Sequence, residues 1–140
     1  MEESTLKYWK DAGHVARRTL EAMKLELTPG KTFHEVIESA ERYIHRHGGK
    51  PAFPGTIAVN DLAAHFTTDH AVNQVEGWDG EMVLQKGDCV KIDFGVHIKG
   101  HIADNALTFE VGNGNEHTEQ IKAAKEARDA AIEMMHPGTP

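Results

Sequence analysis

The sequence predicts an α+β fold in which an antiparallel sheet packs against helices. Residues 91–108 read as a β-hairpin with one apolar face, which is typical of a sheet packed on a core. Two segments before the hairpin repeat apolar residues every three or four positions, as amphipathic helices do. A chain of 140 residues is long enough to bury one hydrophobic core of this kind.

The composition restricts the classes of partner. A net charge of -7 argues against nucleic acid as the main partner. The single cysteine, Cys89, excludes an internal disulfide. The start of the chain lacks the basic and apolar regions of a signal peptide, and no apolar run approaches the roughly 18 residues of a membrane span. We therefore expect a cytoplasmic protein without a membrane or nucleic-acid partner.

Two helices are expected in the first 50 residues. The first runs from about Ser4 to Leu27, with a stripe of apolar or small residues at Trp9, Gly13, Ala16, Leu20, Met23 and Leu27. The second opens with Thr32 and Glu35 at capping-box spacing. Its predicted buried stripe is Val36, Ile37, Ala40, Tyr43, Ile44 and His47.

Residues 51–60 read as an extended edge or loop segment, because its two prolines cannot lie in a central strand. Phe53, between the prolines, suits either a core position or the wall of an apolar pocket, and the core position is favoured because most aromatic residues are buried for packing. A short strand is expected over 61–67, with His65 near its end. A lone histidine in this setting is more often a hydrogen-bonded core or rim residue than a ligand or an acid/base group. The polar stretch 68–87 is expected to be a surface loop.

The hairpin carries two acids. Lys99-Gly100 is the expected two-residue turn, and the resulting register places Asp93 opposite Ala106. Asp93 and Asp104 then share one face as diagonal neighbours, roughly 7–8 Å apart. The opposite face is apolar and collects Val90, Ile92, Phe94, Val96, Ile98, Leu107, Phe109 and Val111.

Two carboxylates on one face repel each other and raise one pKa unless a cation lies between them. Hard divalent ions bind oxygen, and carboxylates from adjacent strands can bridge two such ions. The alternative is a pair of solvated acids on an exposed sheet face. Gly95 and Ala106 leave space beside both acids and slightly favour the metal site.

The last segment predicts an internal repeat. A third helix is expected from Thr118 to His136, with Ile121, Ala124, Arg128, Ala131 and Met135 on one face. Pro-Gly follows both this helix and the first one. We therefore expect residues 1–140 to be a single partial domain, with a first repeat over about 5–112 and the first helix of a second over about 117–136.

Three motifs resemble the methionine aminopeptidases, particularly the archaeal type II enzymes, and the resemblance runs from about residue 6 to the end. They are Pro51-Ala52-Phe53-Pro54, Ala63-Ala64-His65-Phe66-Thr67, and Asp93-Phe94-Gly95 with Asp104-Asn105-Ala106. The resemblance implies a pita-bread fold, in which two α/β halves related by a pseudo-two-fold surround a curved antiparallel sheet with helices on its outer face. This chain would be the N-terminal half of that catalytic domain.

The resemblance also implies roles for four residues. Asp93 resembles the bidentate ligand of one divalent ion, and Asp104 the carboxylate that bridges two ions, which are cobalt, manganese, iron or zinc in the family. His65 resembles the catalytic histidine that binds substrate near the scissile amide. Phe53 resembles part of the pocket for the methionine side chain. The implied substrate is an N-terminal methionyl peptide or nascent protein, whose initiator methionine is removed.

The family also needs a histidine and two glutamates that no motif here supplies, so we expect the chain alone to be inactive. An uncovered sheet edge predicts self-association. Two alternatives stay open: an X-Pro peptidase of the same fold, and a metal-free pita-bread protein that binds protein or RNA. The 63–67 motif argues against the first, and the presence of both Asp93 and Asp104 against the second.

Overall fold

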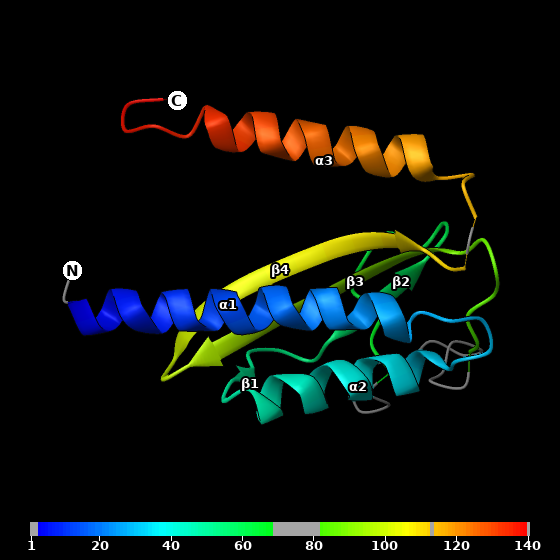
Figure 1. The fold of residues 1–140 in the computed structure, drawn as a ribbon, viewed down its shortest axis with the longest axis horizontal. Helices are drawn as coiled ribbons and strands as arrows, with labels where there is room; N and C mark the ends of the chain where they lie inside the picture. Colours follow the sequence, from blue (N-terminus) through cyan, green and yellow to red (C-terminus); the bar gives the residue numbers. More distant parts are fainter. Residues whose placement is uncertain (1–2, 69–81, 113, 140) are drawn as a thin grey trace.

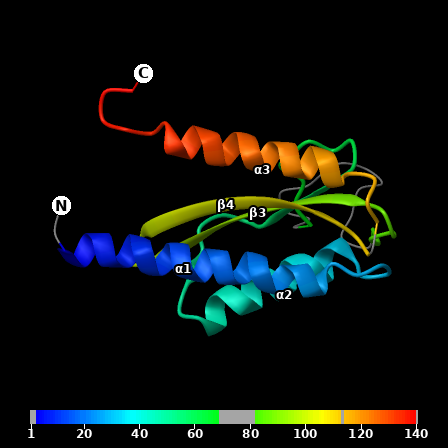
Figure 2. The ribbon, with the colours of Figure 1, turned by 45° about the horizontal axis from the view of Figure 1, so that its top comes forward.

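The computed structural model describes residues 3–68, 82–112 and 114–139. Their elements, in order, are α1 (Glu3–Glu26), α2 (Phe33–Arg46), β1 (Lys50–Pro51), β2 (Thr56–Val59), β3 (Cys89–Ile98), β4 (His101–Glu110) and α3 (Thr118–Glu133). Helices α1 and α2 lie side by side on one side of the sheet, and α3 lies across the sheet from α2 (Figures 1 and 2). The predicted α+β class with an antiparallel sheet is confirmed.

Strand β3 organises the sheet. Both β1 and β2 pair antiparallel with β3, and β4 pairs with β3 as the second arm of the hairpin. Because β1 pairs around His97 and β2 around residues 90–93, the two short strands follow one another along β3 like one interrupted strand. Within the described residues β4 has no other strand partner, so its outer edge is open.

The hairpin has the predicted turn and register. Lys99 and Gly100 have φ of 53° and 82°, the left-handed conformation that a tight two-residue hairpin turn requires. Asp93 lies opposite Ala106 as expected, and Asp104 lies opposite Gly95. A slip of one residue would move both acids to the apolar face, so burial of that face fixes their position.

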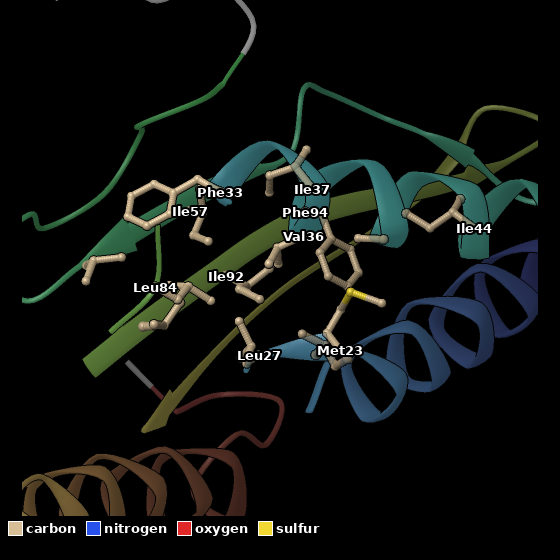
Figure 3. Packing of buried hydrophobic residues seen from close by; sticks show 14 of the residues in the cluster. Met23, Leu27, Phe33, Val36, Ile37, Ile44, Ile57, Leu84, Ile92 and Phe94 are labelled. Atoms are coloured by element: carbon tan, nitrogen blue, oxygen red, sulfur yellow. The ribbon is translucent and has the colours of Figure 1, made fainter. Parts of the chain in front are cut away.

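The core forms between the apolar sheet face and the two N-terminal helices. Met23 of α1, Leu27 directly after this helix and Val36 of α2 pack against Ile92 and Phe94 of β3 (Figure 3). The predicted α1 stripe is wrong at its beginning, because the buried positions start at Ala12 and Trp9 is 42% exposed. Trp9 instead packs its ring edge to face with His101, with centroids 5.2 Å apart. The aromatic residue thus anchors α1 to the hairpin tip.

The predicted capping box begins α2. Thr32 Oγ1 accepts from the Glu35 amide at 3.1 Å, and Glu35 Oε2 accepts from the Thr32 amide at 2.8 Å. The predicted buried stripe is wrong at His47, which is exposed. This residue follows the last helical residue, so it leaves the helix face and stacks on Tyr43 with ring centroids 4.0 Å apart.

The strand expected over 61–67 is absent, because the chain turns at Asn60 and His65, both with positive φ. Most of the expected surface loop, residues 69–81, lies outside the described residues. Its end departs from the expectation, since Leu84 is fully buried and its carbonyl accepts from the Gly30 amide at 2.8 Å.

Helix α3 ends at Glu133, three residues before the predicted end, and none of its residues is buried. Its predicted apolar face is therefore not part of the core. Of the helices described here, none has the length and apolar character needed to cross a membrane. The cytoplasmic location stays a prediction.

Candidate metal centre

Asp93 and Asp104 lie on the sheet face turned away from α1 and α2, which we call the acid face. The register places Lys91, Asp93 and Gly95 of β3 on it, with Asp104 and Ala106 of β4. Asp93 is half-buried and Asp104 is exposed. The structure therefore brings the two predicted ligands together on adjacent strands.

Asp93 is held in a setting that disfavours its own charge. Burial raises the pKa of its carboxyl above the ordinary value, the negative charge of Asp104 raises it further, and a positive charge on His65 opposes both. Asp93 Oδ1 is buried with no hydrogen-bond partner within the described residues. An unpaired buried oxygen of an acid is costly, and a divalent cation would satisfy it. The residues present thus fit a metal ion.

His65 reaches the acid face from the loop after β2. Its backbone has φ of 64°, a conformation that a non-glycine residue adopts at a cost and that often marks a functional site. The side chain is exposed and lies close enough to Asp93 for its charge to lower the carboxyl pKa. His65 is therefore a rim residue beside the carboxylate pair.

Phe53 lies in the gap between β1 and β2. The Ala52 amide donates to the Gly95 carbonyl at 2.9 Å, so residues 52–55 stay against β3 while the strand is interrupted. A Cβ added to Gly95 would come within 2.5 Å of a Phe53 ring carbon, which places the ring directly over this glycine. Because Gly95 faces Asp104, Phe53 forms a wall beside the acids and does not occupy the core.

A cavity of about 650 Å³ separates the acid face from α3. Asp93, Thr56 and Ala106 line it from the sheet, and Ile121 and Arg128 line it from α3. The predicted space is present beside Ala106, whereas the Phe53 ring fills the space expected at Gly95. The cavity is large enough for a short peptide segment.

The carboxylate pair has no third ligand in the part of the chain that the structure describes. No group of three or more histidine, cysteine, aspartate or glutamate side chains is close enough there to hold an ion. Two carboxylates alone form an incomplete site, because divalent ions of this kind take four to six ligands.

The sequence of the chain matches one family of known proteins. Residues 7–140 match metallopeptidase family M24. The chain belongs to this family. The family is one of metallopeptidases, which implies dependence on a divalent metal. The predicted resemblance is confirmed at the level of the family.

Individual M24 relatives give the same result. A methionine aminopeptidase of Thermococcus onnurineus is 39% identical over 127 residues, which are 91% of this chain and 40% of that protein. The methionine aminopeptidase of Thermotoga maritima superposes with a TM-score of 0.83 at 25% identity, over 96% of this chain and 54% of that one. The prolidase of Pyrococcus horikoshii superposes with a TM-score of 0.75 at 28% identity, over 94% and 36%.

The M24 chain spans about two fifths of the length of the curated relatives it matches. Its α+β architecture corresponds to one part of the pita-bread fold of these neighbours. The division into a first repeat and the start of a second stays a prediction.

Proposed function

We propose that the chain is the N-terminal half of a methionine aminopeptidase that removes the initiator methionine from proteins with two divalent metal ions. The carboxylate pair of Asp93 and Asp104 carries this proposal, because both acids share one face and one buried oxygen is unpaired. The identity to the Thermococcus enzyme supports the substrate class. Cobalt, manganese, iron and zinc all suit a site built from carboxylate and imidazole ligands.

Each residue has a distinct task in this proposal. Asp93 and Asp104 hold the ions, which when bound polarise the scissile carbonyl and lower the pKa of water. His65 donates a hydrogen bond to the substrate near the scissile amide. Phe53 packs against the methionine side chain of an N-terminal methionyl peptide or nascent protein. Gly95 leaves room for the Phe53 ring.

The remaining ligands are assigned to sequence outside these 140 residues. This assignment accounts for the absence of a third ligand near the acids within the described residues. The isolated chain should therefore bind divalent ions weakly and turn over methionyl peptides negligibly, while a longer protein that contains it is active.

Calorimetric titration of the 140-residue chain with Mn²⁺ tests the site. We expect weak binding that Asp93→Asn and Asp104→Asn both abolish. Asp11→Asn is the matched control, because Asp11 lies on α1, away from the acid face, where it pairs with Lys7, and the substitution removes the same charge. Binding that survives both substitutions would contradict the proposed site.

Peptide assays test the reaction. A longer protein containing this chain should release methionine from methionyl peptides. It should not cleave peptides that have proline in the second position and a residue other than methionine in the first. The reverse preference would favour an X-Pro peptidase, the alternative that the superposition on a prolidase keeps open. Absence of both metal binding and turnover in that longer protein would favour a metal-free binding module. Turnover by the 140-residue chain at the rate of an intact enzyme would contradict the half-site.

A further inference from the structure

Asn60 begins the loop that carries His65. It follows directly on β2 and has φ of 55°, a left-handed conformation that asparagine adopts more readily than most residues. The chain therefore leaves the sheet sharply at this residue. Five residues later the loop reaches His65 at the rim of the acid face.

All polar groups of Asn60 are bonded to β3 or to the residue just before it. Its amide donates to the Cys89 carbonyl at 2.9 Å, and its Oδ1 accepts from the Cys89 amide at 3.0 Å. Its Nδ2 donates to Asp88 Oδ1 at 3.0 Å, and its carbonyl accepts from Lys91 Nζ at 2.7 Å. An exposed asparagine usually bonds to water, so four bonds to one segment indicate a specific fastening.

The other end of the loop is fastened to a different part of the fold. The Ile57 amide donates to the Phe66 carbonyl at 2.8 Å, and the buried Phe66 ring packs edge to face with Phe33, with centroids 6.1 Å apart. Phe66 thus ties the loop to β2 and α2. Asn60 ties it to β3, the strand that carries Asp93 four residues after Cys89.

We propose that Asn60 is a positioning residue that sets the place of His65 relative to the carboxylate pair. This inference rests on the proposed function. Asn60 itself touches neither the acids nor the place of a substrate, and it acts by holding residues 60–66 and β3 in one register. Small displacements of a substrate-binding group lower the rate of reaction strongly, so such a fastening matters for catalysis.

Asn60→Gly isolates the side-chain bonds, because glycine keeps the left-handed backbone without strain. The matched control is Ala12→Gly, which weakens a fully buried helix position in α1. Ala12 lies in the part of α1 that contacts the hairpin tip through Trp9 and His101, at the opposite end of β3 from Cys89. The control therefore shows what a general loss of stability, away from the loop that carries His65, does to the measurements.

The measurement is paramagnetic relaxation of His65 protons by Mn²⁺ bound to the 140-residue chain, together with Mn²⁺ affinity and amide exchange over 61–66. For Asn60→Gly we expect affinity within twofold of the unchanged chain, several-fold weaker relaxation at His65, and faster exchange across the loop. Ala12→Gly should change none of the three in this region. A purely structural role would alter affinity and His65 relaxation together.

Unchanged His65 relaxation and loop exchange in Asn60→Gly would overturn the inference, as would equal changes in Ala12→Gly. Failure of the proposed function looks different, since Mn²⁺ would then leave the Asp93 and Asp104 signals of the unchanged chain unaffected. In that event amide exchange over residues 61–66 tests the inference by itself. Faster exchange in Asn60→Gly alone supports the role of Asn60 in holding the loop, and equal exchange in both variants refutes that role.

Discussion

The folded structure disfavours the negative charge of Asp93. Burial and the neighbouring Asp104 raise its pKa, while the unfolded chain keeps the ordinary value near 3.8. Between these two values the folded state holds a proton that the unfolded state has lost. The contribution of Asp93 to the free energy of unfolding of the metal-free protein should therefore fall as pH rises through this window and then stay level.

The first prediction follows from this direction of the pH dependence. Asp93→Asn removes the unfavourable charge. The free energy of unfolding of the variant should therefore equal that of the unchanged protein at about pH 3 and exceed it at about pH 7. Urea unfolding of both proteins across this range, without metal, measures the difference. Saturating Mn²⁺ should reverse the order, because the ion stabilises only the protein that binds it. Equal stability at all pH values would contradict the raised pKa.

The second prediction concerns Gly95. A methyl group at this position would collide with the Phe53 ring and with Ala52 Cβ, at 2.5 and 2.9 Å. We expect Gly95→Ala to lower the free energy of unfolding by about 1–3 kcal/mol and to shift the NMR signals of the Phe53 ring.

Gly13→Ala is the control for this substitution, since a Cβ at Gly13 in α1 meets nothing within 4 Å. Alanine is the better helix former, so this variant should gain about 0.5–1 kcal/mol. The same chemical change thus has opposite signs at the two positions. A destabilised Gly13→Ala, or a tolerated Gly95→Ala, would refute the packing described here.

At the scale of elements, the hairpin turn gives the third prediction. Lys99 adopts φ of 53° without the compensation that asparagine or glycine would give. Lys99→Asn creates the favoured Asn-Gly turn and should raise the free energy of unfolding by a few tenths to about 1 kcal/mol.

Gly100→Ala is the paired variant, because Gly100 has φ of 82° and open space around its Cα. It should lose about 1–2 kcal/mol from backbone strain alone. Thermal unfolding of both variants tests the turn. Loss of stability in Lys99→Asn would mean that the two-residue turn is not formed.

At the scale of the whole molecule, the open edge of β4 gives the fourth prediction. This ten-residue strand has no outer partner among the described residues, and its Ile102 is 52% exposed. Open apolar edges pair with other chains, so we expect concentration-dependent association, with a symmetric dimer as its simplest form. Sedimentation equilibrium measures it.

Ile102→Lys should shift this association toward the monomer, because a lysine on an edge strand opposes pairing. Leu25→Lys is the matched control, since Leu25 is 82% exposed on α1 and not on the sheet edge. A clean monomer of the unchanged chain at high concentration would refute the prediction. Equal effects of both variants would point to general apolar contact and not to the edge.

Part of the acid face could be predicted from the sequence. The alternation of side chains and the Lys-Gly turn were sufficient to place Asp93 and Asp104 on one face. A hairpin pairs residues that are close in sequence, and only one register buries its apolar face. The loop after β2 was not predictable in the same way. Asn60 adopts a positive φ where hydrogen bonds to Cys89, Asp88 and Lys91, distant in sequence, hold that conformation, and His65 has a positive φ further along the same loop.

The sequence by itself determined the two long N-terminal helices, the hairpin register and the pair of acids, since periodicity and turn chemistry act over a few residues. Only the tertiary structure decided that Phe53 lies over Gly95 beside the acids and that Asp93 keeps an unpaired buried oxygen. Both results depend on how the interrupted strand β1–β2 lies along β3. Contacts between segments about 40 residues apart depend on the packing of the whole chain, which no local pattern specifies.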